Sequence, residues 1–179
     1  MSISSFVFVS GWPLAAALAR EWDSAGLIFS KLGVIALLVG LNGFFVAAEF
    51  ALVKIRSSQL GTLAAEGNQR ALAGQHVTSS LDAYLSACQL GITLASLGLG
   101  WVGEPFLAQM LQPAFRLMNI ESPAIITSVS FTVAFSLITF LHIVIGEQAP
   151  KILAIRKPLP TTLWVSAPLR FFYAIFKPA

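Results

Sequence analysis

Residues 142–151 read HIVIGEQAPK, and this short stretch closes a long apolar run with groups that hydrocarbon does not tolerate. Pro150 has no backbone N–H, so in a helix the carbonyl of Gly146, four residues earlier, loses its usual donor. Glu147 places a carboxylate beside that carbonyl, and Gly146 leaves room for close approach. Two hard oxygens side by side suit a hard cation. The stretch therefore predicts a cation-binding helix end, with Pro150 as the helix break that shapes the site.

The composition is that of a membrane protein. Of the 179 residues, 56% are hydrophobic and 11% are charged, whereas soluble proteins average about 25% charged residues. The single cysteine, Cys88, excludes an internal disulfide and a cysteine-based metal cage. The basic residues neither cluster nor interleave with aromatic residues, which argues against nucleic acid as a partner. We expect an all-α integral membrane protein embedded in a lipid bilayer.

Three stretches are long and apolar enough to cross a hydrocarbon core of about 30 Å as helices. They comprise residues 27–53, 81–99 and 123–145. The polar residues between the first two predict an extramembrane helical connector at 57–80. The glycines and the proline of 98–105 predict a helix break, followed by a short amphipathic helix at 106–122. The expected fold is thus three transmembrane helices plus connector and juxtamembrane helices.

The flanking charges predict the orientation. The 54–80 connector and the C-terminal tail hold most of the Lys and Arg residues, whereas the 100–122 connector holds only Arg116. Because basic residues accumulate on the cytoplasmic side, we expect the N-terminus outside the cell (inner) membrane and the C-terminus in the cytoplasm.

This orientation divides the chain into three parts. Residues 1–26 are expected to form an outer-face or interfacial segment rather than a cleaved signal, because no basic residue precedes their apolar run. Residues 27–157 are expected to form a three-span transmembrane domain, which holds the candidate cation site. Residues 158–179, rich in aromatic residues, form a cytoplasmic juxtamembrane helix. The chain stops without a polar tail, as a truncation before a soluble domain would.

Two carboxylates in or near the membrane are candidates for function, because ionisable groups there are costly. For Glu147 the alternative is a boundary carboxylate paired with Lys151, four residues on. For Glu49 the alternative is an ion pair with Lys54 or Arg56.

Neutral polar residues could complete a cation site or hold the helices together. The candidates are Asn42, Ser86, Gln89 and Thr93. His142 lies five residues before Glu147, which is neither i+3 nor i+4, so we expect a hydrogen-bonded packing histidine there. The His-Glu-x-x-His pattern of zinc hydrolases is missing, as is a nucleophile and base pair, and we expect no enzyme.

Three blocks in this order resemble the transmembrane domain of the CorC/CNNM family of magnesium transporters, known in bacteria as hemolysin-related proteins. They are NGFFVAAEFAL at 42–52, LSACQLGIT at 85–93 and GEQAPK at 146–151. The resemblance implies a homodimer of three-helix protomers and Mg²⁺ export coupled to Na⁺ entry. It also implies cytoplasmic CBS domains that bind adenine nucleotides, for which this chain has no sequence.

The resemblance also implies the ion site. The third block is matched fully, so Glu147 and the Gly146 carbonyl inherit the ion-binding role. The first block has Val46-Ala47-Ala48-Glu49 where many relatives have Ser-Gly-Ser-Glu. In the second block Cys88 and Gln89 stand where Asn is common, which leaves Gln89 or Asn42 to supply oxygen. We expect a Mg²⁺ transporter; the alternative is a non-transporting membrane anchor or sensing module for a cytoplasmic nucleotide-binding domain.

Overall fold

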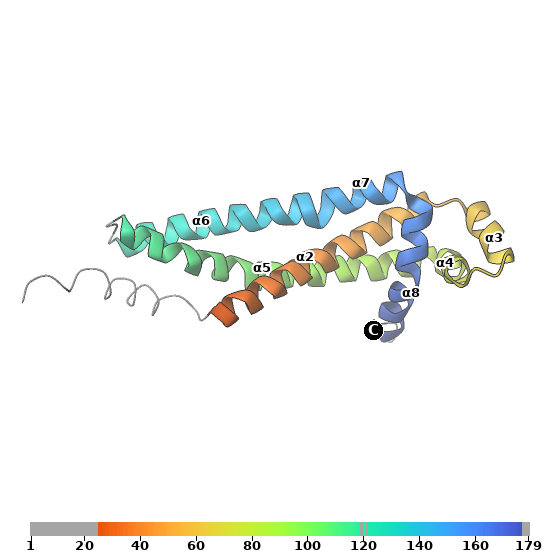
Figure 1. The fold of residues 1–179 in the computed structure, drawn as a ribbon, viewed down its shortest axis with the longest axis horizontal. Helices are drawn as coiled ribbons and strands as arrows, with labels where there is room; N and C mark the ends of the chain where they lie inside the picture. The colour runs from red at the N-terminus through yellow and green to blue at the C-terminus, as the bar shows by residue number, and fades with distance from the viewer. Residues whose placement is uncertain (1–24, 119, 121, 177–179) are drawn as a thin grey trace, which may run out of the picture.

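Three long helical rods lie side by side in the structure, which is a computed structural model and describes residues 25–118, 120 and 122–176 (Figure 1). The first rod is α2 (Ala25–Lys54) and the second is α5 (Leu81–Leu117). The third joins α6 (Pro123–Leu141), the π-helix η1 (His142–Gln148) and α7 (Ala149–Arg156). Each rod is long and apolar enough to cross a membrane. The predicted all-α membrane fold with three spans is confirmed, while residues 1–24 of the expected N-terminal segment lie outside the described residues.

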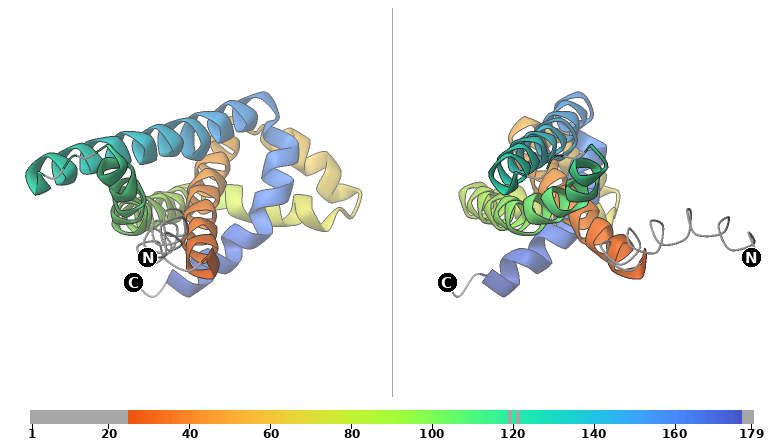
Figure 2. Two further views of the ribbon diagram at one scale, coloured as in Figure 1. Left: turned by 60° about the vertical axis from the view of Figure 1, so that its left-hand side comes forward. Right: turned by 90° about the vertical axis from the view of Figure 1, so that its left-hand side faces the viewer.

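Short helices gather at one end of the rods (Figures 1 and 2). They are α3 (Ser57–Ala65), α4 (Gln69–Ser79) and α8 (Pro158–Phe176). The helical connector and the helix after residue 157 therefore form as expected. A buried cluster joins α8 to this end of the bundle, with residues from α2, α4, α5 and α8. Its members are Phe45, Ala48, Leu52, Val77, Tyr84, Cys88, Val165 and Leu169.

The predicted helix break at 98–105 is wrong, because α5 continues through it to Leu117. Within hydrocarbon every backbone group needs a partner, so leaving the helix would cost several hydrogen bonds where Pro105 costs about one. Gly98 and Gly103 serve packing instead of a turn, whereas a Cβ built on Gly100 would have nothing within 4 Å. A Cβ built on Gly103 would lie 2.8 Å from Ile138 of α6, so this glycine lets α5 and α6 approach closely. Leu99, Phe106 and Ile138 are buried together around this contact.

The predicted helix end near Pro150 is also wrong, because the third rod runs on to Arg156. The rod changes its hydrogen-bond register instead of stopping. Within η1 the bonds join residues five apart, and the backbone N–H of Ala149 donates to the carbonyl of Val144. Pro150 lies in the first turn of α7, where a missing N–H is tolerated. Pro150 thus ends a π-helical segment and leaves the rod continuous.

Candidate functional site

The polar cluster begins where α2 crosses η1. Asn42 is 1% exposed, and its Nδ2 donates to the carbonyl oxygen of Gly146 at 2.9 Å. Pro150 cannot donate to that oxygen in α-helical register, and the Asn42 amide donates to it from across the helix interface. The carbonyl that the sequence marks as short of a donor is therefore bonded across the helix interface.

The close contact depends on the next residue, Gly43. A Cβ built on Gly43 would lie 2.9 Å from Cγ of Pro150 and 3.7 Å from the Gly146 oxygen. Any larger residue would push η1 and α7 away from α2. Further along the same interface, Ala47 and Ala51 pack against Ala154, so small residues keep the two helices close.

The third helix, α5, contributes Ser96 to the cluster. The Ser96 hydroxyl donates to Oδ1 of Asn42 at 3.2 Å, and it lies 3.2 Å from Nε2 of His142. The prediction of a hydrogen-bonded packing histidine is confirmed. We define the polar cluster as Asn42, Ser96, His142 and Gly146, with one contribution from each of α2 and α5 and two from η1.

The polar cluster lies deep in the bundle. Asn42 is 12 residues before Lys54, the end of α2, which corresponds to about 18 Å along the helix axis. Asn42 and Gly146 are buried there, and Ser96 and His142 are half-buried, so water competes least for the hydrogen bond between Asn42 and Gly146.

Sequence reasoning missed Ser96 and left His142 outside the site. The spacing argument compared His142 with Glu147 on the same helix, whereas the structure pairs His142 with Ser96 on α5. The signal for Ser96 was its position beside Ala95 and Leu99, which belong to the buried face of α5.

The other candidate ligands on α5 lie elsewhere. Ser86, Gln89 and Thr93 are exposed in the single chain. The Ser86 hydroxyl donates to the Asp82 carbonyl at 3.0 Å, and the Thr93 hydroxyl donates to the Gln89 carbonyl at 2.8 Å. Within one chain these residues do not join Asn42.

The two carboxylates occupy different surroundings. Glu147 follows Gly146 directly and is half-buried. Glu49 is also half-buried, and it acts electrostatically on Lys151 and Cys88. Lys151 places its ammonium 4.5 Å from the ring centroid of Phe50. Within the described ranges Lys151 makes no ion pair with Glu147, so the boundary-pair alternative for Glu147 gains no support.

The available donors suit a hard cation better than a soft one. No group of three or more His, Cys, Asp or Glu side chains that could hold a metal occurs among residues 25–118, 120 and 122–176. The bundle holds the half-buried carboxylate of Glu147 next in sequence to Gly146, whose carbonyl belongs to a cluster with the amide of Asn42 and the hydroxyl of Ser96. Mg²⁺ uses such oxygens and keeps several waters, with only one or two carboxylates in its shell.

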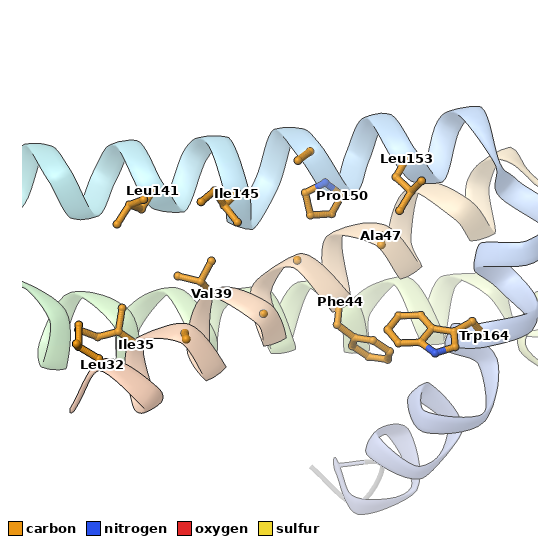
Figure 3. Close-up of a pocket in the computed structure, with 14 residues that line it drawn as sticks. Leu32, Ile35, Val39, Phe44, Ala47, Leu141, Ile145, Pro150, Leu153 and Trp164 are labelled. Carbon is orange, nitrogen blue, oxygen red and sulfur yellow. The ribbon is translucent and has the colours of Figure 1, made fainter. Parts of the chain in front are cut away.

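An apolar groove of about 820 Å³ lies between α2 and the third rod (Figure 3). Side chains from α2, such as Val39, face Ile145 and Pro150 across it, and Phe44 and Trp164 lie next to each other at one end. Their ring centroids are 5.6 Å apart. Because its lining is apolar, the groove offers a cation no ligands, and we separate it from the polar cluster.

The chain matches known proteins along most of its length. The family described as cyclin M transmembrane N-terminal domain (CNNM) matches residues 33–179. The UPF0053 proteins YugS and YhdT of Bacillus subtilis are each 48% identical, over 85% and 81% of this chain and 35% and 31% of their own lengths. The uncharacterized protein Rv1841c of Mycobacterium tuberculosis is 34% identical over 84% of this chain and 42% of its own length. The chain spans about a third of the length of the Bacillus relatives.

The family match covers α2 from residue 33 onward, the other two rods, the helices at their end and the polar cluster. The resemblance read from the three sequence blocks is confirmed. The chain belongs to the CorC/CNNM family and is a multi-pass membrane protein.

Proposed function

We propose that this domain binds a divalent cation, Mg²⁺, and moves it across the membrane. The observation that carries the proposal is the half-buried Glu147 directly after Gly146, whose carbonyl faces an amide from α2 deep in the bundle. A carboxylate, a carbonyl and an amide oxygen are the ligands that a hard cation prefers. Family membership and the fully matched GEQAPK block support the same assignment.

The proposed path runs through the bundle core. Glu147 supplies the charge, and the Gly146 carbonyl and Asn42 supply neutral oxygens. Transport requires the helices to open this site to each side in turn. A π-helical segment such as η1 is frequent at functional sites. We keep the expected orientation, with the N-terminus outside, and the expected mode, which is export coupled to Na⁺ entry.

Thermal stabilisation by Mg²⁺ tests the binding step. We expect Mg²⁺ to raise the melting temperature of the purified protein and Glu147→Gln to abolish that rise. Glu66→Gln is the matched control, because Glu66 is exposed at the end of α3. If Glu147→Gln melts like the wild type and keeps the full Mg²⁺ effect, Glu147 is not a ligand.

Flux into proteoliposomes tests transport. A Mg²⁺-sensitive dye inside the vesicles should report uptake or release that depends on Glu147 and responds to an imposed Na⁺ gradient. If the flux depends on Glu147 but does not respond to the Na⁺ gradient, Na⁺ coupling is rejected and Mg²⁺ transport is retained.

We also propose that the domain works as a homodimer. Ser86, Gln89 and Thr93 share one exposed face of α5, and polar side chains facing lipid are costly. A second copy against this face would cover them. Cysteines at Gln89 should cross-link between two copies more readily than cysteines at the neighbouring Leu90, and equal yields would exclude this face.

A non-transporting membrane anchor or sensing module is the second candidate. The observation in its favour is that the Gly146 carbonyl already has a partner, because the Asn42 amide donates to it. On this view the polar cluster only locks the helices together. Proteoliposomes that show no Mg²⁺ flux, from protein whose Glu147→Gln variant melts identically with and without Mg²⁺, would favour the anchor.

A further inference from the structure

The polar cluster forms one unbranched chain of hydrogen bonds across three helices. Nε2 of His142 lies 3.2 Å from the Ser96 hydroxyl, which lies 3.2 Å from Oδ1 of Asn42. Nδ2 of Asn42 lies 2.9 Å from the Gly146 oxygen. Both ends of the chain return to η1, since His142 and Gly146 are four residues apart. A Cβ built on Gly146 would meet Cδ2 of His142 at 3.2 Å and Nδ2 of Asn42 at 3.3 Å.

The Gly146 carbonyl, at the end of this chain of hydrogen bonds, fixes the direction of every bond in it. A backbone carbonyl can only accept, so Asn42 must turn its NH₂ group toward Gly146. Its Oδ1 then faces Ser96 and accepts a hydrogen bond from the Ser96 hydroxyl. The hydroxyl oxygen must in turn accept from His142, so the imidazole carries its proton on Nε2. Only one tautomer of His142 satisfies all the groups at once.

A cation bound to the Gly146 carbonyl would require the opposite direction. The NH₂ group of Asn42 cannot face a cation, so the amide has to turn and present Oδ1. The NH₂ group then donates to the Ser96 oxygen, and the Ser96 hydroxyl donates to Nε2 of His142. The imidazole now carries its single proton on Nδ1. This second arrangement satisfies the same groups with each donor and acceptor exchanged.

We propose that Ser96 and His142 are positioning residues that set the orientation of the Asn42 amide, and that cation binding reverses the whole chain. This inference rests on the proposed function, since it assigns Gly146 and Asn42 to the cation. The two arrangements differ by one amide turn, one hydroxyl rotation and one imidazole tautomer. They make the polar cluster a two-state element whose balance the cation shifts.

The tautomer of His142 is the readout, because a merely structural histidine would keep it. The experiment uses the full chain with ¹⁵N-labelled imidazoles and His76→Gln, which removes the other histidine. Nitrogen chemical shifts, which differ between a protonated and an unprotonated ring nitrogen, are recorded with and without Mg²⁺ at one fixed pH. We expect the proton on Nε2 without Mg²⁺ and on Nδ1 with saturating Mg²⁺.

Ser96→Ala tests whether the signal passes through the hydroxyl. We expect this variant to lose the Mg²⁺-dependent tautomer change while Mg²⁺ still raises its melting temperature through Glu147. Ser136→Ala, at an exposed position of α6, should leave the change intact. Ser96→Thr, which restores a hydroxyl, should restore it.

The outcomes separate the two proposals. If Mg²⁺ stabilises the wild type but the tautomer stays the same, or if Ser96→Ala still switches, the positioning role is overturned and cation binding stands. If Mg²⁺ neither stabilises the wild type nor changes the tautomer, the proposed function fails and this inference fails with it. An Nδ1 proton in the absence of Mg²⁺ would overturn the bond directions themselves.

Discussion

Asn42 and Pro150 should be thermodynamically coupled although they lie on different helices. Asn42 donates to the Gly146 oxygen at 2.9 Å, and Pro150 removes the α-helical donor that would lie four residues after Gly146. In Asn42→Ala the buried oxygen loses its side-chain donor, which costs about 1–3 kcal/mol. In Pro150→Ala the backbone N–H of residue 150 returns and can bond that oxygen in α-helical register.

The double variant isolates this effect. Loss of the side-chain volume of Asn42 and loss of the ring contact between Pro150 and Gly43 occur equally in both backgrounds, so they cancel in a double-mutant cycle. Asn42→Ala should cost about 2–3 kcal/mol alone and about 1 kcal/mol in the Pro150→Ala background, which gives a coupling energy of about 1–2 kcal/mol.

Reversible unfolding in mixed micelles, followed by tryptophan fluorescence, gives the four free energies. The wild type and the three variants are compared at one detergent composition. A coupling energy within about 0.5 kcal/mol of zero would mean that the two residues act independently. The Asn42 amide would then not replace the missing helical donor, and the reasoning about the polar cluster would be wrong.

Three further predictions concern close packing. Gly43→Ala should destabilise the protein by about 1–3 kcal/mol, because its Cβ would lie 2.9 Å from a proline ring, whereas Gly40→Ala, with nothing within 4 Å, should change little in the same unfolding assay. Gly91→Ala should lower the melting temperature because its Cβ would meet a phenylalanine ring of α2 at 2.5 Å, and Gly100→Ala, with open space around it, is its control. Cys88 is fully buried, so maleimide labelling should be slow in the folded protein and fast after unfolding; rapid labelling of the folded protein would contradict the packing of α2 on α5.

The three spans could be predicted because hydropathy and length decide them, whatever the packing. The break at 98–105 could not, because glycine and proline mark turns only where water can bond the freed backbone. In hydrocarbon the helix persists, and Gly103 instead admits Ile138. The same physics carries the third rod past Pro150 and exchanges α for π register, a shift of one residue that hydropathy does not reveal.

The candidate site was half predictable. Asn42, Gly146 and Glu147 follow from spacing and from the chemistry of a missing donor. The α5 residue of the cluster could not be predicted from the sequence, because its role depends on which face of α5 packs against the other helices. Gly91 lies on that face, and at about 100° per residue Gln89 and Thr93 point away from it. Reading the buried stripe of small residues first would have excluded both.

The cluster that joins α8 to the bundle makes a mechanical linkage. Phe45 packs against Phe172 of α8 with ring centroids 4.7 Å apart, and it follows Asn42 by three residues, about one helical turn. Val165 and Leu169 of α8 are fully buried in the same cluster, so α8 cannot slide freely over α2. A movement of α8 would therefore be transmitted through Phe45 to α2, one helical turn from the Asn42 amide.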